Sequence, residues 1–449
     1  MKAELIKKIR EKSARITVVG LGRIGLPVAV IFANAGYQVV GVDNNEDLVK
    51  ALSKSRFSSK EPGIQELIRE MVKIGRLEAT TDIAKAVKST NIVIICVQTP
   101  LNDATDPNLS YLQKACTTIA KSLSKGKLMI LESTVPPGTT RNFVAPILEK
   151  KSKLKCGENF WLVHCPERIA PGKAIQELTE NARIVGGFDT ESAKIAAELL
   201  TKVTKGAVLI TDCTSAEVAK LAENTFRYVN IAFANELALI CEHMGVDVIE
   251  AIKIANTHPR VNIHNPGCGV GGPCLTKDSY LLLHTIRKKD FSSKVISSSR
   301  KLNDAMPEHA VRLLLKILKK MGKNVKKLKI AILGVAYKGQ VDDATNSPAK
   351  PIVQRLMDLG ASVVVYDPYC KETFGAKKTS SVVSAVRGKD CVLIEADHDL
   401  FKNLDLRELK SVMRENPIIV DCRRIIDVTK AKKHGFLYIG TGYGSAEIS

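Results

Sequence analysis

The residues best suited to chemistry lie between positions 267 and 274, which read GCGVGGPC. Four glycines in six positions indicate backbone pressed against a neighbour or an unusual turn. Cys274 follows at once, with Lys277 and Asp278 just beyond it. A thiol near a lysine and the N-terminus of a following helix can be held as thiolate, the nucleophilic form. Cys274 is therefore the candidate nucleophile, and the alternative is one more buried cysteine.

A second group of candidates is expected on one long helix. Lys220 and Asn224 are four residues apart and share a face, with Arg227 near the same stripe. A lysine and an amide that project together suit an oxyanion or a developing alkoxide. Asp278 is expected one helical turn after Cys274, as a base or an acid. The alternative for Lys220 and Asn224 is an ordinary solvated helix face.

The sequence Cys165-Pro166-Glu167-Arg168 follows an expected strand. A carboxylate and a guanidinium at a strand end suit the binding of a polar substrate. A salt bridge within the loop explains them about as well. Both interpretations of Glu167 and Arg168 stay open on the sequence alone.

A dinucleotide fingerprint lies near the start of the chain. Gly20, Gly22 and Gly25 match GxGxxG between an expected strand and helix, and Asp43 ends the next strand. The glycines permit a tight turn, approach to a pyrophosphate and close packing of helix on strand. The helix N-terminus would face the anion. Because the Asp43 carboxylate repels a 2′-phosphate, NAD is favoured over NADP. The alternative is a glycine turn without a ligand.

Strands and helices alternate at both ends of the chain, and a helical stretch separates them. This order predicts an α/β fold with two Rossmann-like, doubly wound domains joined by a central helical section. The predicted domains are residues 1–205, 206–320 and 321–449. The expected strands cover 16–20, 37–42, 92–97, 128–131, 329–334, 363–366, 391–395 and 418–420, and the expected helices 25–35, 215–255 and from 275 to about 318.

The composition and charge of the chain argue against a membrane protein, a secreted protein and a nucleic-acid-binding protein. No apolar run among the 449 residues approaches the length that spans a bilayer, and residues 1–12 are too charged for a signal peptide. We expect a cytoplasmic protein without a membrane partner. The net charge of +20 is spread along the chain without interleaved aromatic residues, which favours a Lys-rich soluble surface over nucleic-acid binding.

The cysteines show no ligand pattern. The chain has 11, none of them in a CxxC pair or in a cluster with zinc-ligand spacing. We therefore predict no metal site. We also predict a reduced compartment, in which most of these cysteines are small apolar core residues.

Eight ordered motifs together resemble the UDP-glucose/GDP-mannose dehydrogenase family over nearly the whole chain. Such a series is far more specific than one glycine motif. The motifs are GLGRIGLP at 20–27, VQTP at 97–100, ESTVPPGTT at 132–140, CPER at 165–168, KLAENTFR at 220–227, PGCGVGGPCLTKD at 266–278, LGVAYKG at 333–339 and DCRR at 421–424.

The resemblance implies NAD-dependent oxidation of the carbon-6 alcohol of a UDP-sugar to a carboxylate, through an aldehyde. Cys274 would add to the aldehyde as a thiohemiacetal, a second NAD would oxidise this to a thioester, and water would release the acid. By the same resemblance, Lys220 and Asn224 stabilise the oxyanion or relay protons. Asp278 would assist the lysine or a water, and Glu167 would assist hydrolysis.

The resemblance also implies binding roles. The first domain would hold NAD, the third would hold UDP, and the helical section would form the interface of a homodimer or larger homo-oligomer. The implied NAD-site residues are Gly20, Gly22, Arg23, Ile24, Gly25, Asp43, Thr99 and Thr134. The implied substrate-binding residues are Arg168, Ile169, Lys220, Asn224, Arg227, His258, Arg260, Gly271, Tyr337, Lys338 and Arg423.

The segment HPRVN at 258–262 resembles the branch that acts on UDP-N-acetyl-D-mannosamine, a branch associated with polysaccharide biosynthesis. There His258 and Arg260 reach the substrate, Arg260 from across the dimer. UDP-N-acetylglucosamine and UDP-glucose are the alternative substrates. Two positions depart from the family pattern: Thr345 stands where arginine is usual, and Pro273 stands where the acetylated-sugar branch often has histidine.

Two further alternatives assign the chain to other functional classes of protein. A relative of the 6-phosphogluconate or 3-hydroxyacid dehydrogenases would share the first domain and a lysine-bearing helical section, but would need no cysteine. A basic nucleic-acid-binding protein on a degenerate dehydrogenase fold would explain the charge. Cys274, with the second nucleotide-type domain, argues against the first, and the intact glycine motif with Asp43 argues against the second.

Overall fold

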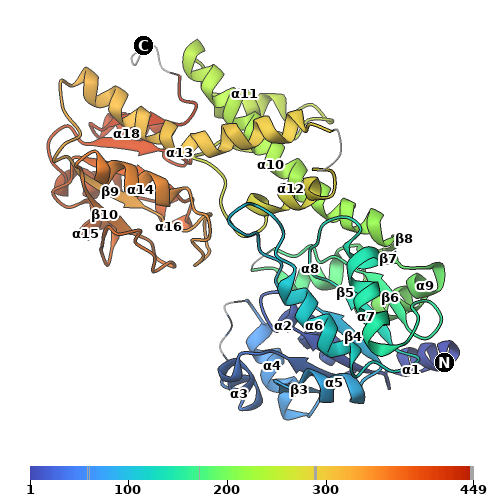
Figure 1. Cartoon of the computed structure of the whole chain (residues 1–449). Coiled ribbons are helices and arrows are strands. Elements are labelled where there is room, and N and C mark those ends of the chain that lie inside the picture. Colours follow the sequence, from blue (N-terminus) through green and yellow to red (C-terminus); the bar gives the residue numbers. More distant parts are fainter. Residues whose placement is uncertain (58, 60, 171, 288–290, 445–449) are drawn as a thin grey trace. The chain divides into compact units, whose positions relative to one another are not determined.

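Two sheets, of eight and six strands, form the frame of the chain and lie in different units (Figure 1). The computed structural model describes residues 1–57, 59, 61–170, 172–287 and 291–444. Unit 1 comprises Met1–Glu223 with Tyr280–Phe291, and unit 2 comprises Asn224–Ser279 with Ser292–Ser449. The α/β class, with two parallel-dominated sheets and a long helical region between them along the chain, is confirmed. The three predicted domain limits stay a prediction.

The sheet of unit 1 has the order β3-β2-β1-β4-β5-β6-β7-β8. Neighbouring strands are parallel except β6 and β7, which are antiparallel. The first five strands in this order carry the nucleotide-binding pattern. The strands are β1 Arg15–Val19, β2 Gln38–Val42, β3 Leu77–Thr80, β4 Ile92–Ile95, β5 Leu128–Leu131, β6 Trp161–His164, β7 Arg183–Gly187 and β8 Val208–Asp212.

Both faces of this sheet are covered, because alternate strand residues enter two separate hydrophobic clusters. On one face α1, α2, α4, α8 and α9 pack, and on the other α5, α6 and α7. The helical segments are α1 Lys2–Arg10, α2 Gly25–Asn34, α3 Glu46–Ser53, α4 Ile64–Lys73, α5 Ile83–Ser89, α6 Ser110–Ala120, the π-helical turn η1 Thr140–Val144, α7 Ala145–Ser152, α8 Ala174–Glu180 and α9 Thr190–Leu200.

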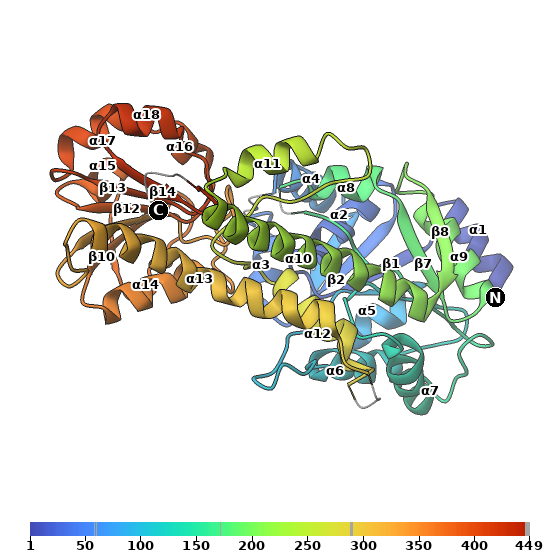
Figure 2. The same cartoon turned by 90° about the horizontal axis from the view of Figure 1, so that it is seen from above.

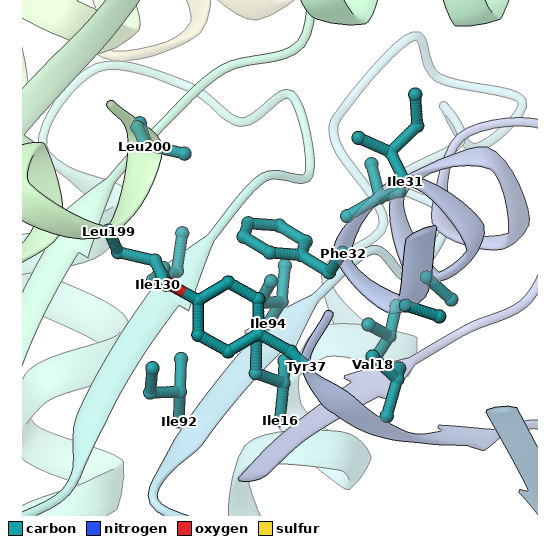
Figure 3. Packing of buried hydrophobic residues seen from close by; sticks show 14 of the residues in the cluster. Ile16, Val18, Ile31, Phe32, Tyr37, Ile92, Ile94, Ile130, Leu199 and Leu200 are labelled. Carbon is teal, nitrogen blue, oxygen red and sulfur yellow. The ribbon is translucent and has the colours of Figure 1, made fainter. Parts of the chain in front are cut away.

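Tyr37 lies at the centre of the first cluster (Figure 3). Its ring meets Phe32 edge-on, with 6.0 Å between centroids. Its hydroxyl donates a hydrogen bond of 2.8 Å to the carbonyl of Ile9, and burial raises the pKa of Tyr37 to about 12. This hydrogen bond connects α1 to the rest of the cluster. We did not predict α1, because the N-terminal sequence is highly charged. Its apolar side, Leu5 and Ile9, is buried.

Four helices make up the central part of the chain, and the boundary between the units falls within the first of them. One helical segment was expected over 215–255, but it is broken at Gly245, where φ is +73°. The Asp247 side chain then caps the next helix. In unit 2, Asn235 bonds to Asn303 at 2.9 Å, which joins α10 to α13 (Figure 2). The helices are α10 Cys213–Met244, α11 Val248–Ala255, α12 Leu275–His284 and α13 Lys294–Lys320.

The sheet of unit 2 is parallel throughout, in the order β11-β10-β9-β12-β13-β14. Its strands are β9 Lys329–Leu333, β10 Ser362–Tyr366, β11 Lys377–Lys378, β12 Cys391–Ile394, β13 Ile418–Asp421 and β14 Leu437–Gly440. Its remaining helices are α14 Ala349–Asp358, α15 Val382–Val386, α16 Asp399–Lys402, α17 Leu406–Val412 and α18 Val428–Lys433. We did not predict β14, although it completes the sheet.

Candidate functional site

The glycine loop after β1 has the geometry that a dinucleotide requires. Gly20 has φ +92°, and a Cβ there would lie 2.8 Å from the carbonyl oxygen of Cys96. A Cβ on Gly25 would lie 1.8 Å from the carbonyl oxygen of Gly20, so helix and strand pack too closely for any side chain. Beside Gly22 no atom lies within 4 Å of the Cβ position. The loop is thus closed on its protein side and open at Gly22, where a pyrophosphate would approach.

Asp43 and the start of α2 complete this arrangement. One Asp43 oxygen accepts a bond from the Leu21 amide at 2.8 Å, and the other accepts one from the Asn45 amide at 2.9 Å. No side chain caps the N-terminus of α2, so its first amides can donate to an anion. These features fit NAD, with the ribose at Asp43 and the pyrophosphate at Gly22. Arg23 is exposed and Ile24 half-buried in the same loop.

Thr99 and Thr134 lie together after neighbouring strands β4 and β5. The Thr99 hydroxyl donates a hydrogen bond of 2.6 Å to the Thr134 carbonyl. The carboxyl ends of parallel strands meet at one edge, where doubly wound sheets bind their ligands. The structure therefore brings these two threonines to the edge of the sheet that carries the glycine loop.

A buried ionic cluster, which we define as Glu132, Glu167 and Arg183, lies at that edge too. Arg183 contacts Glu167 at 2.6 Å and Glu132 at 3.0 Å, and the three side chains are almost completely buried. Burial raises the pKa of Glu132 to about 7, although the Arg183 charge opposes the rise. Of these three residues we predicted a role only for Glu167. Glu132 stood unremarked within the ESTVPPGTT motif.

Arg168 and Ile169, predicted to bind substrate, lie just beyond Glu167 and are half-buried. The Arg168 guanidinium pairs with Glu223 at 2.8 Å and also donates to the carbonyl of Ala182. Arg168 and Glu167 therefore pair with partners outside the loop, Glu223 on α10 and Arg183 on β7, and not with each other. A role for Arg168 in substrate binding stays a prediction.

In unit 2 the glycine loop before Cys274 is pressed against the loop after β9. A Cβ on Gly271 or Gly272 would lie 2.7 or 2.8 Å from side-chain atoms of Tyr337. The Gly272 amide donates to the carbonyl of Thr345 at 2.8 Å. The expected close approach of backbone is confirmed, and the neighbour is Tyr337, itself a predicted substrate residue.

Cys274 follows this loop at the start of α12. It is exposed, whereas nine of the other cysteines are buried and Cys96 is half-buried. The alternative of one more buried cysteine is thereby excluded. An accessible thiol at the first turn of a helix has its N–H groups nearby, which favours the thiolate.

Asp278 lies one turn further along α12, as predicted, and is buried. One of its oxygens accepts a bond of 2.6 Å from the Asn224 amide, and the other pairs with Lys277 at 2.9 Å. Asn224 is thus oriented by Asp278, which binds one N–H of its amide, and the amide nitrogen carries a second N–H that can donate to another acceptor. This contact joins two of the predicted catalytic residues across 54 positions of sequence.

Arg423 and Lys338 lie near the carboxyl edge of the second sheet. Arg423 pairs with Asp397 at 3.1 Å and approaches to 3.0 Å of the Cβ position of Gly267. Lys338 lies 6.0 Å from the centre of the Tyr337 ring. Near them Glu395 is buried, and burial raises its pKa well above the ordinary value. These positions match the switch-point rule for open α/β sheets.

Asp367 ends β10 as Asp43 ends β2, but its hydrogen bonding is different. Its oxygens accept bonds from His398 and from the amides of Val335, Ala336, Tyr369 and Cys370. Burial would raise the pKa of Asp367, yet the bond from His398 and the amides hold it well below its ordinary value. A carboxylate so fully bonded has little capacity left for a ribose. The sheet region of unit 2 therefore resembles that of unit 1 in topology and differs from it at the position where unit 1 would bind the ribose.

The remaining predicted residues lie on the central helices and their loop. Lys220 is half-buried and belongs to unit 1, while Arg227, His258 and Arg260 are exposed in unit 2. The Arg260 amide donates to His258 at 3.3 Å. The grouping of Lys220 with Cys274, Asn224 and Asp278 in one site stays a prediction.

No cluster of three or more His, Cys, Asp or Glu side chains among the described residues is arranged to hold a metal ion. None of the described helices combines the length and the apolar character that crossing a bilayer requires.

Family models match three consecutive parts of the chain, all of the UDP-glucose/GDP-mannose dehydrogenase family. The NAD binding domain matches residues 14–204, the central domain 214–305 and the UDP binding domain 331–428.

Relatives match over almost their full length. The chain is 44% identical over 430 residues to a UDP-N-acetyl-D-mannosamine dehydrogenase of Pyrococcus horikoshii, covering 96% of this chain and 99% of that one. It is 41% identical to a protein of the same name from Methanocaldococcus jannaschii, covering 96% and 97%. A solved structure of UDP-D-ManNAc dehydrogenase from Pyrococcus horikoshii has a TM-score of 0.89 at 42% identity, covering 96% and 100%. The chain belongs to the UDP-glucose/GDP-mannose dehydrogenase family and is an NAD-dependent enzyme of that family.

Proposed function

We propose that this enzyme oxidises the carbon-6 alcohol of a UDP-N-acetylhexosamine to a carboxylate, with UDP-N-acetyl-D-mannosamine as the first candidate substrate. The observation that carries the proposal is Cys274, the one exposed cysteine, at the end of a glycine loop packed on Tyr337. Two relatives that match over almost their full length, at 44% and 41% identity, have names that specify UDP-N-acetyl-D-mannosamine.

The residues of the first domain would hold the cofactor. The open face at Gly22 and the uncapped start of α2 suit the pyrophosphate, and Asp43 suits the ribose. Thr99 and Thr134 lie at the same edge of the sheet. NAD, when bound, supplies the acceptor for one hydride in each of the two oxidations. A carboxylate at position 43 selects against the additional phosphate of NADP.

Cys274 has the central chemical role. Its thiolate attacks the aldehyde carbon, and the resulting thiohemiacetal loses a hydride to give a thioester. Lys220 and Asn224 stabilise the oxyanion by charge and by amide donation. Glu167 takes a proton from the attacking water, whose oxygen bonds to the acyl carbon as the carbon–sulfur bond breaks. The sugar carboxylic acid loses its remaining proton to solvent and leaves as the carboxylate, Cys274 returns to thiolate, and Glu167 passes its proton to solvent.

The proposed substrate site draws on unit 2. Tyr337, Lys338 and Arg423 lie at or near the carboxyl edge of the sheet that matches the UDP binding domain. His258 and Arg260 are exposed, which suits a role for Arg260 at the site of a partner subunit. Thr345 stands where arginine is usual in the family. Its carbonyl oxygen accepts a hydrogen bond from the Gly272 amide, and its hydroxyl donates one to Asp343 at 2.6 Å. The position therefore supports the glycine loop.

Counting the NADH formed per sugar tests the function. Purified enzyme with NAD and UDP-N-acetylmannosamine, UDP-N-acetylglucosamine or UDP-glucose, in separate reactions, is expected to yield two NADH per molecule of one acetamido sugar. One NADH per sugar would contradict the thioester route. Turnover with UDP-glucose alone would contradict the roles given to His258 and Arg260.

The helical section presents an apolar stripe suited to a homodimer. Phe226, Phe233, Ile240 and Met244 follow one face of α10 at spacings of seven and four residues, and are 62%, 49%, 47% and 70% exposed. Exposed apolar stripes of this kind mark protein interfaces.

Phe226→Glu combined with Phe233→Glu is therefore expected to dissociate the enzyme, because two charges would be buried at the interface. Light scattering after size exclusion should show the mass of one chain in place of two or more. Met357→Glu, at a residue 40% exposed on α14, is the control and should leave the mass unchanged. An unaltered mass in the double variant would refute this interface.

A further inference from the structure

The buried ionic cluster holds more acid than base. Glu132, Arg183 and Glu167 are 3%, 5% and 7% exposed. Two carboxylates share a single guanidinium, so the cluster would carry one net negative charge if both were ionised. Burial of a net charge is costly, and a buried group usually responds by binding a proton. One of the two carboxyls is thus expected to hold a proton more strongly than usual.

The contacts show which carboxyl this is. Glu167 forms an ion pair with Arg183 at 2.6 Å, without the geometry of a hydrogen bond, and its other oxygen accepts a strong hydrogen bond from the Arg168 amide at 2.6 Å. Glu132 has a longer contact to Arg183, at 3.0 Å, and its other oxygen meets only the Cys96 sulfur, at 3.3 Å. A thiol is a weak donor and also a weak acceptor. Glu132 is therefore the carboxyl that can hold a proton, in agreement with its pKa of about 7.

The thiols and the guanidinium that face Glu132 do not change their charge near pH 7. Burial raises the pKa of Cys96, which follows β4, and of Cys165, which follows β6, so both remain thiols. Arg183, on β7, keeps its charge. The proton on Glu132 is then the one change in charge that Glu167 experiences through Arg183 as the solution passes neutrality.

We propose that Glu132 is a positioning residue of the proposed reaction, which sets the orientation and the basicity of Glu167 through Arg183. When Glu132 is protonated, Arg183 is matched to Glu167 alone and weakens it as a base. When Glu132 is ionised, the guanidinium is shared and Glu167 accepts a proton from water more readily. This inference rests on the proposed function, in which Glu167 activates the water that releases the acid.

Cys96 links this cluster to the cofactor loop. A Cβ on Gly25 would lie 3.0 Å from the Cys96 Cβ, and the Cys96 sulfur touches Glu132. The water-activating carboxyl and the dinucleotide loop of unit 1 are thus joined by Cys96, Glu132 and Arg183, each in contact with the next.

Glu132→Gln tests the proposal, because it removes the titration and keeps the shape of the side chain. Wild-type kcat is expected to rise through a midpoint near neutral pH, and the variant should lose this step. Glu217→Gln is the matched control, since Glu217 is 1% exposed and bonds to the Gly138 and Thr140 amides outside the cluster. The control should lose stability and keep the wild-type midpoint.

Thermal unfolding gives a readout that needs no substrate. The folded pKa of Glu132, about 7, lies above its unfolded value, so its stabilisation is complete at low pH and is lost as pH rises through about 7. Glu132→Gln has no such loss. Its Tm relative to wild type is expected to increase by on the order of 5 °C between pH 5 and pH 8. Burial also raises the pKa of Glu217, so Glu217→Gln is the control for the kcat midpoint and not for this Tm trend.

Cys96→Ser is the second variant, for the case in which Glu132→Gln does not fold. A hydroxyl donates more strongly than a thiol and should move the kcat midpoint to lower pH. A wild-type midpoint in Cys96→Ser or Glu132→Gln, or a Tm difference independent of pH in Glu132→Gln, would overturn the proposal. If wild-type enzyme forms no NADH with any UDP-sugar, the proposed function fails, while the Tm comparison still reports on the cluster.

Discussion

Cys274→Ser is expected to bind NAD as wild type does and to lose turnover by at least about 10³-fold. A serine hydroxyl has a far higher pKa than a thiol and is not present as the anion near neutral pH. The variant cannot form the thioester, so the second NADH per sugar should disappear. NAD binding by calorimetry and NADH formation by absorbance together check this result.

Cys241→Ser is the control for the loss of a sulfur. Cys241 is buried at 7% exposure among apolar residues of α10 and α11, and its thiol has no assigned role. This variant should retain turnover, with at most a modest loss of stability. Full turnover by Cys274→Ser, with two NADH per sugar, would contradict covalent catalysis.

Arg183→Leu is expected to destabilise unit 1 by about 3–5 kcal/mol, because two buried carboxyls lose the cation that pairs with both of them. Both carboxyls would then bind protons in the folded state, so their pKa values would rise. Raised folded pKa values make stability fall as pH increases. The loss should therefore be larger at pH 8 than at pH 5, and urea unfolding followed by far-UV circular dichroism measures it.

Arg10→Leu removes an arginine that pairs with Glu198 at 3.1 Å on the surface, and serves as the control. Solvent screens that pair, so a much smaller change is expected. A wild-type unfolding midpoint for Arg183→Leu, or a loss of equal size at both pH values, would show that the ionic cluster is not a source of stability.

The dinucleotide loop was predictable because its requirements are local. The turn at Gly20, the packing at Gly25 and the position of Asp43 depend on one strand, one helix and the next strand. The loop before Cys274 was predictable for the same reason, because the glycines next to it in the sequence indicate a close approach of the backbone to a neighbour. Only the contact partner, Tyr337, required the structure, since it lies 65 residues beyond Gly272 along the chain.

The buried ionic cluster could not be predicted from local sequence. Its members come from three strands or the loops that follow them, and Arg183 is near Glu167 because β7 runs antiparallel to β6. The register pairs His164 with Gly186, and continuing it by three residues puts Glu167 opposite Arg183. The reversal of β7 and β8 relative to the other six strands gives no local signal, since pairing direction depends on the whole sheet.

Asp367 is a second case in which the sequence context does not predict the hydrogen-bond partners of a carboxylate. By sequence it repeats Asp43, a strand-ending aspartate after a glycine loop. In the structure His398, 31 residues away, and four backbone amides satisfy its oxygens. The sequence by itself therefore determined the α/β class, the NAD fingerprint and the cysteine that we propose as the nucleophile, because these follow from short-range periodicity and turn chemistry. Which charged groups meet, which are satisfied and which keep a proton was decided by tertiary structure, because strand order and burial bring together residues that the chain keeps apart.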